Sequence, residues 1–177
     1  MATRSEPDPD ADLGTDADPE SFARQILLRR LTDQPRTRAD LAGTLAKKGV
    51  QSDVAQSLLD RFEDVGLIDD EEFARSWVQS RQRSRGLAGR ALAQELRRKG
   101  VDEEVVRDAI NAIDPESERE AARALVRKKL RSMRGLDHDV QVRRLAGMLA
   151  RKGYGSGVAF GVVREELAAD HEPLDSR

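Results

Sequence analysis

The stretch that decides the fold is Leu92–Val101, LAQELRRKGV. Its frame is Leu, three residues, Leu, two residues, Lys-Gly and an apolar residue. The two leucines fall on one face of a helix at i and i+4, and the glycine supplies the positive φ that ends such a helix. The frame recurs at 41–50 and at 145–154, with its glycine shifted by 51 and then by 53 residues. Three copies predict a tandem repeat.

The repeated unit is predicted to hold three helices. In the first unit, apolar residues at helical spacing predict helices over 22–31, over about 38–48, and after Ser52 as a possible N-cap. Phe22-Ala23-Arg24 returns as Phe73-Ala74-Arg75 at the same offset of 51. The third unit matches the second at two different offsets: Ala122-Arg123 follows Ala74-Arg75 by 48 residues, whereas Gly153 follows Gly100 by 53. The third unit therefore has about five extra residues between these two matches, near 132–139.

The chain is therefore expected to be all-α, with tandem three-helix, helix-turn-helix-like repeats in an elongated, curved array. The repeats are expected at 21–68, 69–115 and 116–168. Hydrophobic residues make up 38%, charged residues 36% and aromatic residues 3% of the 177 residues, which suits thin helical modules better than one large core.

Residues outside the repeats are expected to form loose tails. Residues 1–20 carry seven acidic side chains against one basic side chain, with little apolar surface to bury, and are predicted to be a disordered acidic tail. Residues 169–177 are predicted to be a second disordered tail. Without cysteine, an apolar run near the ~20 residues of a membrane span, or a secretory signal, we expect a soluble cytoplasmic protein.

Enzymatic chemistry has little support in the sequence. The two histidines, His138 and His171, fall in a predicted loop and a tail, with no partner spacing for a metal. Neither a Gly-x-Gly-x-x-Gly sequence nor a Walker A sequence is present. Paired acids such as Glu103-Glu104 lie at helix starts, where they cap helices. We expect no catalysis, no cofactor and no metal.

Basic residues are the informative feature of the second and third units. Residues 72–101 hold eight Arg or Lys and two acids, and residues 118–154 hold eleven bases and four acids. An ordinary soluble face mixes the two signs, so these windows favour a surface for nucleic acid or for an acidic protein groove over merely solvated helices. The candidate binding residues are Arg81, Arg83, Arg85, Arg90, Arg97, Arg98, Lys99, Arg127, Lys128, Lys129, Arg144, Arg151 and Lys152.

Aromatic residues indicate how such a surface would bind. Five of them (Phe22, Phe62, Phe73, Trp77 and Phe160) occupy predicted core positions, and only Tyr154 is expected to be exposed. Binding to single strands on stacking platforms needs several exposed rings, so tight independent binding of this kind is not expected. The Arg-rich helices also lack the Asn, Gln and Ser variety that reads base edges, which makes a helix-turn-helix DNA-binding regulator the weaker alternative. A purely protein-binding helical scaffold, which would ignore nucleic acid and salt, is the other alternative.

Four stretches together resemble the RecX family, the bacterial modulators of the RecA recombinase. They are Gly66-Leu67-Ile68-Asp69-Asp70 with Phe73-Ala74, Ser80-Arg81 with the turn to Gly86, Leu92–Val101, and Arg127-Lys128-Lys129 with Leu149–Tyr154. The resemblance covers about residues 23–167. The Ala-, Arg- and Asp-rich composition is typical of a high-GC bacterium such as an actinobacterium.

The resemblance implies a regulator, mainly an inhibitor, that binds in the groove of the RecA–DNA filament. It implies modulation of RecA ATPase, strand exchange and the co-protease activity of the SOS response. The implied partner is the RecA nucleoprotein filament, with weak or non-specific DNA contact, no membrane association, and action as a monomer.

Overall fold

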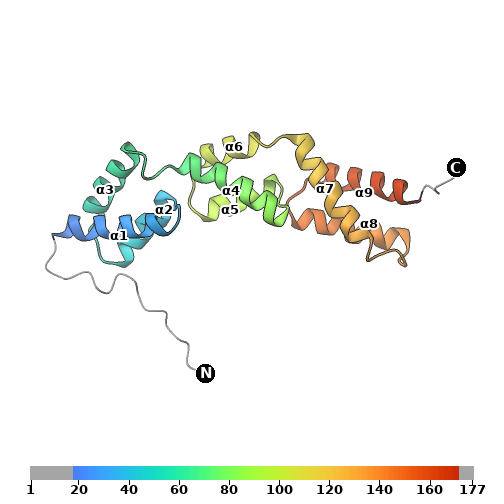
Figure 1. Ribbon diagram of the computed structural model, residues 1–177, viewed down its shortest axis with the longest axis horizontal. Coiled ribbons are helices and arrows are strands. Elements are labelled where there is room, and N and C mark those ends of the chain that lie inside the picture. Colours follow the sequence, from blue (N-terminus) through green and yellow to red (C-terminus); the bar gives the residue numbers. More distant parts are fainter. Residues whose placement is uncertain (1–17, 172–177) are drawn as a thin grey trace, which may run out of the picture. The chain divides into compact units, whose positions relative to one another are not determined.

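The computed structural model describes residues 18–171, and within this range all regular secondary structure is helical (Figure 1). The nine helices of the described part are α1 (Pro19–Asp33), α2 (Arg38–Lys47), α3 (Ser52–Asp64), α4 (Asp70–Arg85), α5 (Gly89–Arg98), α6 (Glu103–Asn111), α7 (Pro115–Leu130), α8 (His138–Arg151) and α9 (Ser156–His171). They form three successive groups of three, which confirms the all-α repeat fold. None of the helices in this range is long and apolar enough to span a bilayer.

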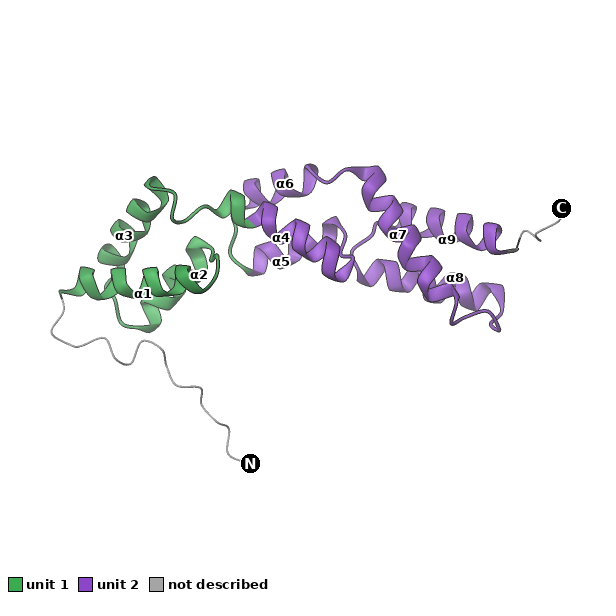
Figure 2. Ribbon diagram, viewed as in Figure 1, with its two compact units in different colours: residues 1–73, 99–101 green, residues 74–98, 102–177 purple. Residues whose placement is uncertain are grey.

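The described residues divide into two compact units (Figure 2). Unit 1 contains the residues up to 73 together with 99–101, and unit 2 contains 74–98 together with the residues from 102 onward. This division falls within α4, whereas the repeats predicted from the sequence meet at residues 68 and 69. The repeat boundaries therefore stay predictions.

Unit 1 has a core of aliphatic side chains between α1, α2 and α3. The largest fully buried residues of this core are Ile26, Leu27, Leu41, Leu45, Leu58 and Leu59. Within each helix these residues are one or four positions apart, so every helix buries one stripe and exposes the rest. Burying each of these side chains contributes roughly 1.5–3 kcal/mol relative to its exposed state.

Residues 99–101 lie against the start of α2 within unit 1. The Thr37 hydroxyl donates to the Lys99 carbonyl over 2.8 Å, and the same oxygen accepts from the Asp40 amide at 3.1 Å. A Cβ atom added to Gly100 would lie 2.4 Å from the Cβ of Ala39. Thr37 therefore caps α2 and fixes residues 99–101 at the same time, and only glycine fits at position 100.

Unit 2 repeats this arrangement between α5 and the end of α8. The Ala88 amide donates to the Lys152 carbonyl over 2.8 Å, and the Tyr154 hydroxyl donates to the Gly86 carbonyl at 3.2 Å. Thr37 and Ala88 are 51 residues apart, which is the offset between the first two repeats. In its second and third copies the Lys-Gly frame thus ends a helix and also places a carbonyl and a bare Cα against the first turn of another helix, whereas a Cβ on Gly49 of the first copy would meet nothing within 4 Å.

The largest core of unit 2 lies among α7, α8 and α9. Val126, Leu145, Leu149, Val162 and Val163 have no exposed surface. Tyr154 and Ala88 join this core from the contact between α5 and the end of α8. Unit 2 therefore packs α7, α8 and α9 in one continuous region that also includes Ala88, the residue directly before α5.

Several helix ends differ from the sequence expectation. Helix α1 begins at Pro19 rather than after residue 20, because Asp18 accepts from the Ser21 amide and proline is favourable in the first turn. Ser52 is the first residue of α3 and not its N-cap, since the cap position belongs to Gln51. Helix α9 continues to His171, past the boundary predicted at residue 169.

Helix α8 also starts earlier than the sequence indicates. His138, predicted to lie in a loop, is the first residue of α8, which has 14 residues against 10 in α5. The extra residues of the third repeat are therefore divided between the connector 131–137 and an additional helical turn. The buried Gln141 side chain donates to the Met133 carbonyl over 2.9 Å and fastens this connector. Of the predicted disordered tails, 1–20 and 169–177, the parts 1–17 and 172–177 lie outside the described residues.

Candidate functional site

The thirteen basic residues selected from the sequence fall into two groups, and the first group is already engaged within the fold. Arg81 stacks over the Trp77 ring with its guanidinium carbon 4.2 Å from the ring centroid. Its Nε lies 3.4 Å from the Glu95 carboxylate, which also accepts from the Trp77 indole at 2.8 Å. These three side chains form a half-buried cluster in unit 2, so Arg81 braces α4 against α5.

Arg97 and Arg127 have their charges compensated by bidentate carboxylates. Arg97 donates to both Glu103 oxygens at 2.6 and 2.7 Å, and hydrogen bonding to that carboxylate raises the arginine pKa. Arg127 donates to the mostly buried Glu166 at 2.8 and 2.9 Å, and this bonding raises its pKa as well. Paired in this way, both guanidinium groups are less available to an external anion.

The two lysines of the Lys-Gly frames are also engaged. The Lys99 ammonium lies 3.8 Å from the Asp40 carboxylate in unit 1. The Lys152 ammonium donates to the Arg85 carbonyl over 2.6 Å in unit 2. Both side chains therefore reinforce the contacts that their own carbonyls make with a preceding helix start.

The second group remains exposed and lacks an ion pair with any carboxylate of the described residues. The eight exposed residues of this group are Arg83, Arg85, Arg90, Arg98, Lys128, Lys129, Arg144 and Arg151. An exposed cation without a neighbouring acid attracts an anionic ligand more strongly, because no fixed counter-charge reduces its electrostatic potential. Binding by these residues stays a prediction.

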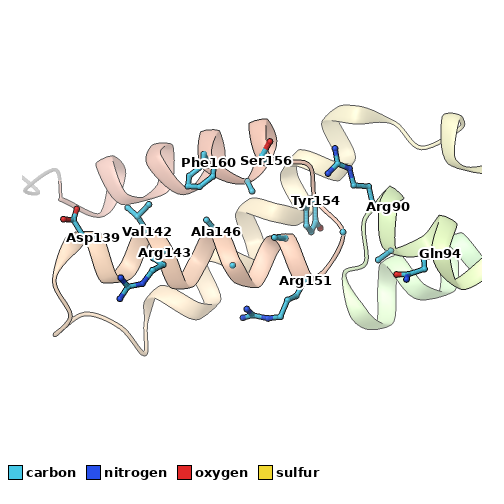
Figure 3. A pocket seen from close by; sticks show the side chains of 15 residues that line it. Arg90, Gln94, Asp139, Val142, Arg143, Ala146, Arg151, Tyr154, Ser156 and Phe160 are labelled. Atoms are coloured by element: carbon cyan, nitrogen blue, oxygen red, sulfur yellow. The ribbon is translucent and has the colours of Figure 1, made fainter.

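Three of the eight come together around α8, along with one arginine that the selection omitted. Lys129, Arg143, Arg144 and Arg151 line a cavity of about 600 Å³ that also contacts Met133 and Met148. Arg143 and Arg151 extend from the same side of α8 and also line a neighbouring groove, where Arg90 joins them from α5 (Figure 3). We call these five residues, Arg90, Lys129, Arg143, Arg144 and Arg151, the α8 basic surface. The other members of the second group line neither of these two cavities.

Arg143 could have been selected from its spacing. Arg143, Gly147 and Arg151 follow at i, i+4 and i+8, so they share one face of α8. Gly147 has no side chain between the two arginines, and a Cβ there would lie 3.3 Å from an Arg151 guanidinium nitrogen. This face presents two cations on either side of a position without a side chain.

The predictions for two aromatic residues were wrong. Phe160, predicted in the core, is 48% exposed, whereas Tyr154, predicted exposed, is 3% exposed. The buried stripe of α9 runs through Ala159, Val162, Val163 and Leu167, and Phe160 lies at the edge of this stripe rather than within it. Tyr154 is buried because the Lys-Gly-Tyr turn contacts the residues before α5. Helical spacing alone would have allowed Phe160 into the core, since Phe160 and the buried Leu167 are two turns apart on α9, and no local signal marks the burial of Tyr154.

Comparisons with known proteins agree with the repeat architecture. Family models of the first, second and third three-helix domains of RecX match residues 23–62, 69–110 and 116–163. The chain is 54% identical over 158 residues to the regulatory protein RecX of Streptomyces lividans, covering 89% of this chain and 84% of that protein. It is 48% identical over 178 residues to the regulatory protein RecX of Thermobifida fusca, covering 99% and 96%. These relatives come from actinobacteria, as the composition suggested.

Two solved structures share the fold. The crystal structure of RecX from Lactobacillus salivarius superposes with a TM-score of 0.80 at 19% identity, covering 85% of this chain and 97% of that one. A crystal structure of regulatory protein RecX gives a TM-score of 0.75 at 26% identity, covering 84% and 73%. The likeness extends over nearly the whole of the described range.

Proposed function

This chain belongs to the RecX family of regulatory proteins, and from that membership we propose that it regulates the RecA recombinase by binding in the groove of the RecA–DNA filament. Regulation here is mainly inhibition. The protein acts through binding and performs no catalysis of its own, in keeping with a family of regulatory proteins.

The α8 basic surface is the observation that carries this proposal. Its five cations come from α5, α7 and α8 and line two adjoining cavities. None of them forms an ion pair with a carboxylate of the described residues. A nucleoprotein filament offers closely spaced phosphates, which attract such a surface over a Debye length of about 8 Å at physiological salt. Arg and Lys contact phosphates without reading sequence, so the DNA contact is weak and non-specific.

Occupation of the filament groove accounts for the range of activities affected. A monomer that bridges neighbouring RecA protomers hinders their rearrangement during ATP hydrolysis and strand exchange. It also obstructs the surface that RecA offers in its co-protease activity. The action is expected in the cytoplasm, where RecA filaments form, and requires no cofactor.

The experiment is a titration of the full chain into RecA, single-stranded DNA and ATP, with hydrolysis followed continuously. We expect inhibition at fewer than one molecule of this protein per RecA, because one molecule contacts several protomers. Unchanged hydrolysis at excess protein would contradict the proposal. Preference for one duplex sequence by ~10³ or more over random DNA, together with unchanged hydrolysis, would instead identify a helix-turn-helix regulator.

A further inference from the structure

We propose that the groove between α5, α8 and α9 binds an acidic segment of the RecA protein itself, which inserts a large apolar side chain against Phe160. This inference rests on the proposed function and adds to it a protein contact distinct from the DNA phosphates.

The floor of the groove is apolar and made of small residues. The groove lies entirely within unit 2 and encloses about 610 Å³. Its floor is formed by Ala91, Ala146, Gly147, Ala150 and Ala159. Because these residues are short, they leave depth between the helices without offering a side-chain hydrogen-bond donor. Such a floor accommodates an aliphatic or aromatic side chain.

Phe160 forms an exposed apolar wall beside this floor. Its ring extends from α9 next to Val142 and Ala146 of α8 (Figure 3). It is 48% exposed, and it is the only largely exposed aromatic side chain in the part of the chain that the structure describes. A large exposed ring beside an apolar hollow costs solvation free energy in the free protein and favours a partner that covers it.

The rim of the groove determines the charge of the partner. Arg90, Arg143 and Arg151 surround the apolar floor, and none has a carboxylate partner among residues 18–171. The single acid of the lining, Asp139, lies at the far end from Arg90 (Figure 3). An acidic segment with an apolar anchor therefore matches the groove in both charge and polarity.

A nucleic acid strand matches the same groove less well. Phosphates need donors along their path, but the floor of alanine and glycine has no polar side chains. Single-strand binding usually uses several aromatic platforms for successive bases, whereas this groove has one exposed ring. The phosphates have a better site in the neighbouring cavity, which Lys129 and Arg144 line together with the shared Arg143 and Arg151.

The test uses two groove variants of the full chain that leave every charge in place. Phe160→Ala removes the exposed wall, and Ala150→Leu fills the floor from an exposed position on α8. Leu136→Ala is the matched control, since Leu136 is 36% exposed in the same unit and does not line the groove. Affinities are measured by fluorescence anisotropy for labelled RecA–single-stranded DNA filaments and for the same DNA without RecA.

We expect each groove variant to lose roughly tenfold or more in filament affinity, as for exposing one apolar side chain, and to keep its affinity for free DNA within about twofold. The control should match the wild type on both ligands. Unchanged filament affinity of both groove variants would overturn the inference and leave the proposed function intact. An equal loss on free DNA would assign the groove to nucleic acid and overturn it too. If the wild type did not bind filaments, the proposed function itself would fail.

Discussion

A Cβ atom added to Gly153 would lie 2.4 Å from the amide nitrogen of Ala91, so the turn that ends α8 contacts the backbone of α5 with no room for a side chain. Gly153 also has φ 94°, a conformation that residues other than glycine adopt only under strain. The carbonyl of the preceding Lys152 accepts from Ala88 beside it. The Lys-Gly frame is therefore a contact between repeats as well as a helix end.

Replacing Gly153 should cost more stability than replacing the equivalent glycine of the first repeat, which has no close neighbour. Gly153→Ala adds strain of roughly 1–3 kcal/mol from the positive φ and a similar amount from the clash with Ala91. Gly49→Ala is the matched control, because Gly49 has φ 77° but a Cβ there meets no described atom within 4 Å. Urea unfolding should show the larger loss for Gly153→Ala, and equal losses would mean that the close approach to Ala91 contributes nothing.

Arg81 is expected to act as a structural residue despite its selection from the sequence as a binding residue. Arg81→Gln removes the stacking on Trp77 and the ion pair with Glu95, which together should lower the free energy of unfolding by roughly 1 kcal/mol. Trp77 is the only tryptophan of the chain, so its emission should change in the folded variant. Affinity for DNA should stay the same. Unchanged emission together with weaker DNA binding would show that Arg81 is a binding residue and not a structural one.

Tyr154 should make stability depend on pH in the alkaline range. Burial, aided by the negative charge of Glu118, raises the pKa of its phenol from 10.0 to about 12. Below pH 10 the phenol is protonated in both states and its contribution is complete. Between about pH 10 and 12 the unfolded chain loses this proton first, so the free energy of unfolding falls.

The variant Tyr154→Phe isolates this effect from all other titrating groups. It loses the hydrogen bond to the Gly86 carbonyl, worth roughly 1 kcal/mol, at neutral pH. The difference in unfolding free energy between the wild type and the variant should then shrink and reverse in sign as pH rises toward 12, because the rise of the phenol pKa from 10.0 to about 12 outweighs one hydrogen bond. A constant difference across this range would show that the phenol is not held protonated by the fold.

The sequence predicted the repeats because their signals are local. Leu92, Leu96 and Gly100 lie within nine residues of one another, and the same frame recurs twice. The engagement of the basic residues was not predictable in the same way. Glu166 lies 39 residues from Arg127, and the burial of Tyr154 depends on Gly86, 68 residues away. Contacts between residues so far apart in the sequence arise from the packing of helices, and a local sequence pattern does not predict them.

The free cations of the α8 basic surface should account for the salt dependence of DNA binding. Lys129, Arg144 and Arg151 are exposed, so replacing all three with Gln should leave helicity and stability nearly unchanged. If each contacts a phosphate, the log–log slope of affinity for single-stranded DNA against salt should shrink by roughly 2, at about 0.7 per contact. Arg97→Gln should leave the slope nearly unchanged, because Arg97 is paired with Glu103. Equal slopes for the triple variant and the wild type would mean that these cations are merely solvated.

The central claim, that the α8 basic surface regulates RecA, is tested most directly by DNA-dependent ATP hydrolysis with three forms of the full chain. The wild type and Arg97→Gln should inhibit RecA at the same concentration, because the paired guanidinium contributes little to binding. The triple variant of Lys129, Arg144 and Arg151 should require at least tenfold more protein for the same inhibition, corresponding to the loss of about 1.4 kcal/mol of binding free energy. Equal inhibition by the triple variant, or no inhibition by the wild type, would contradict the claim.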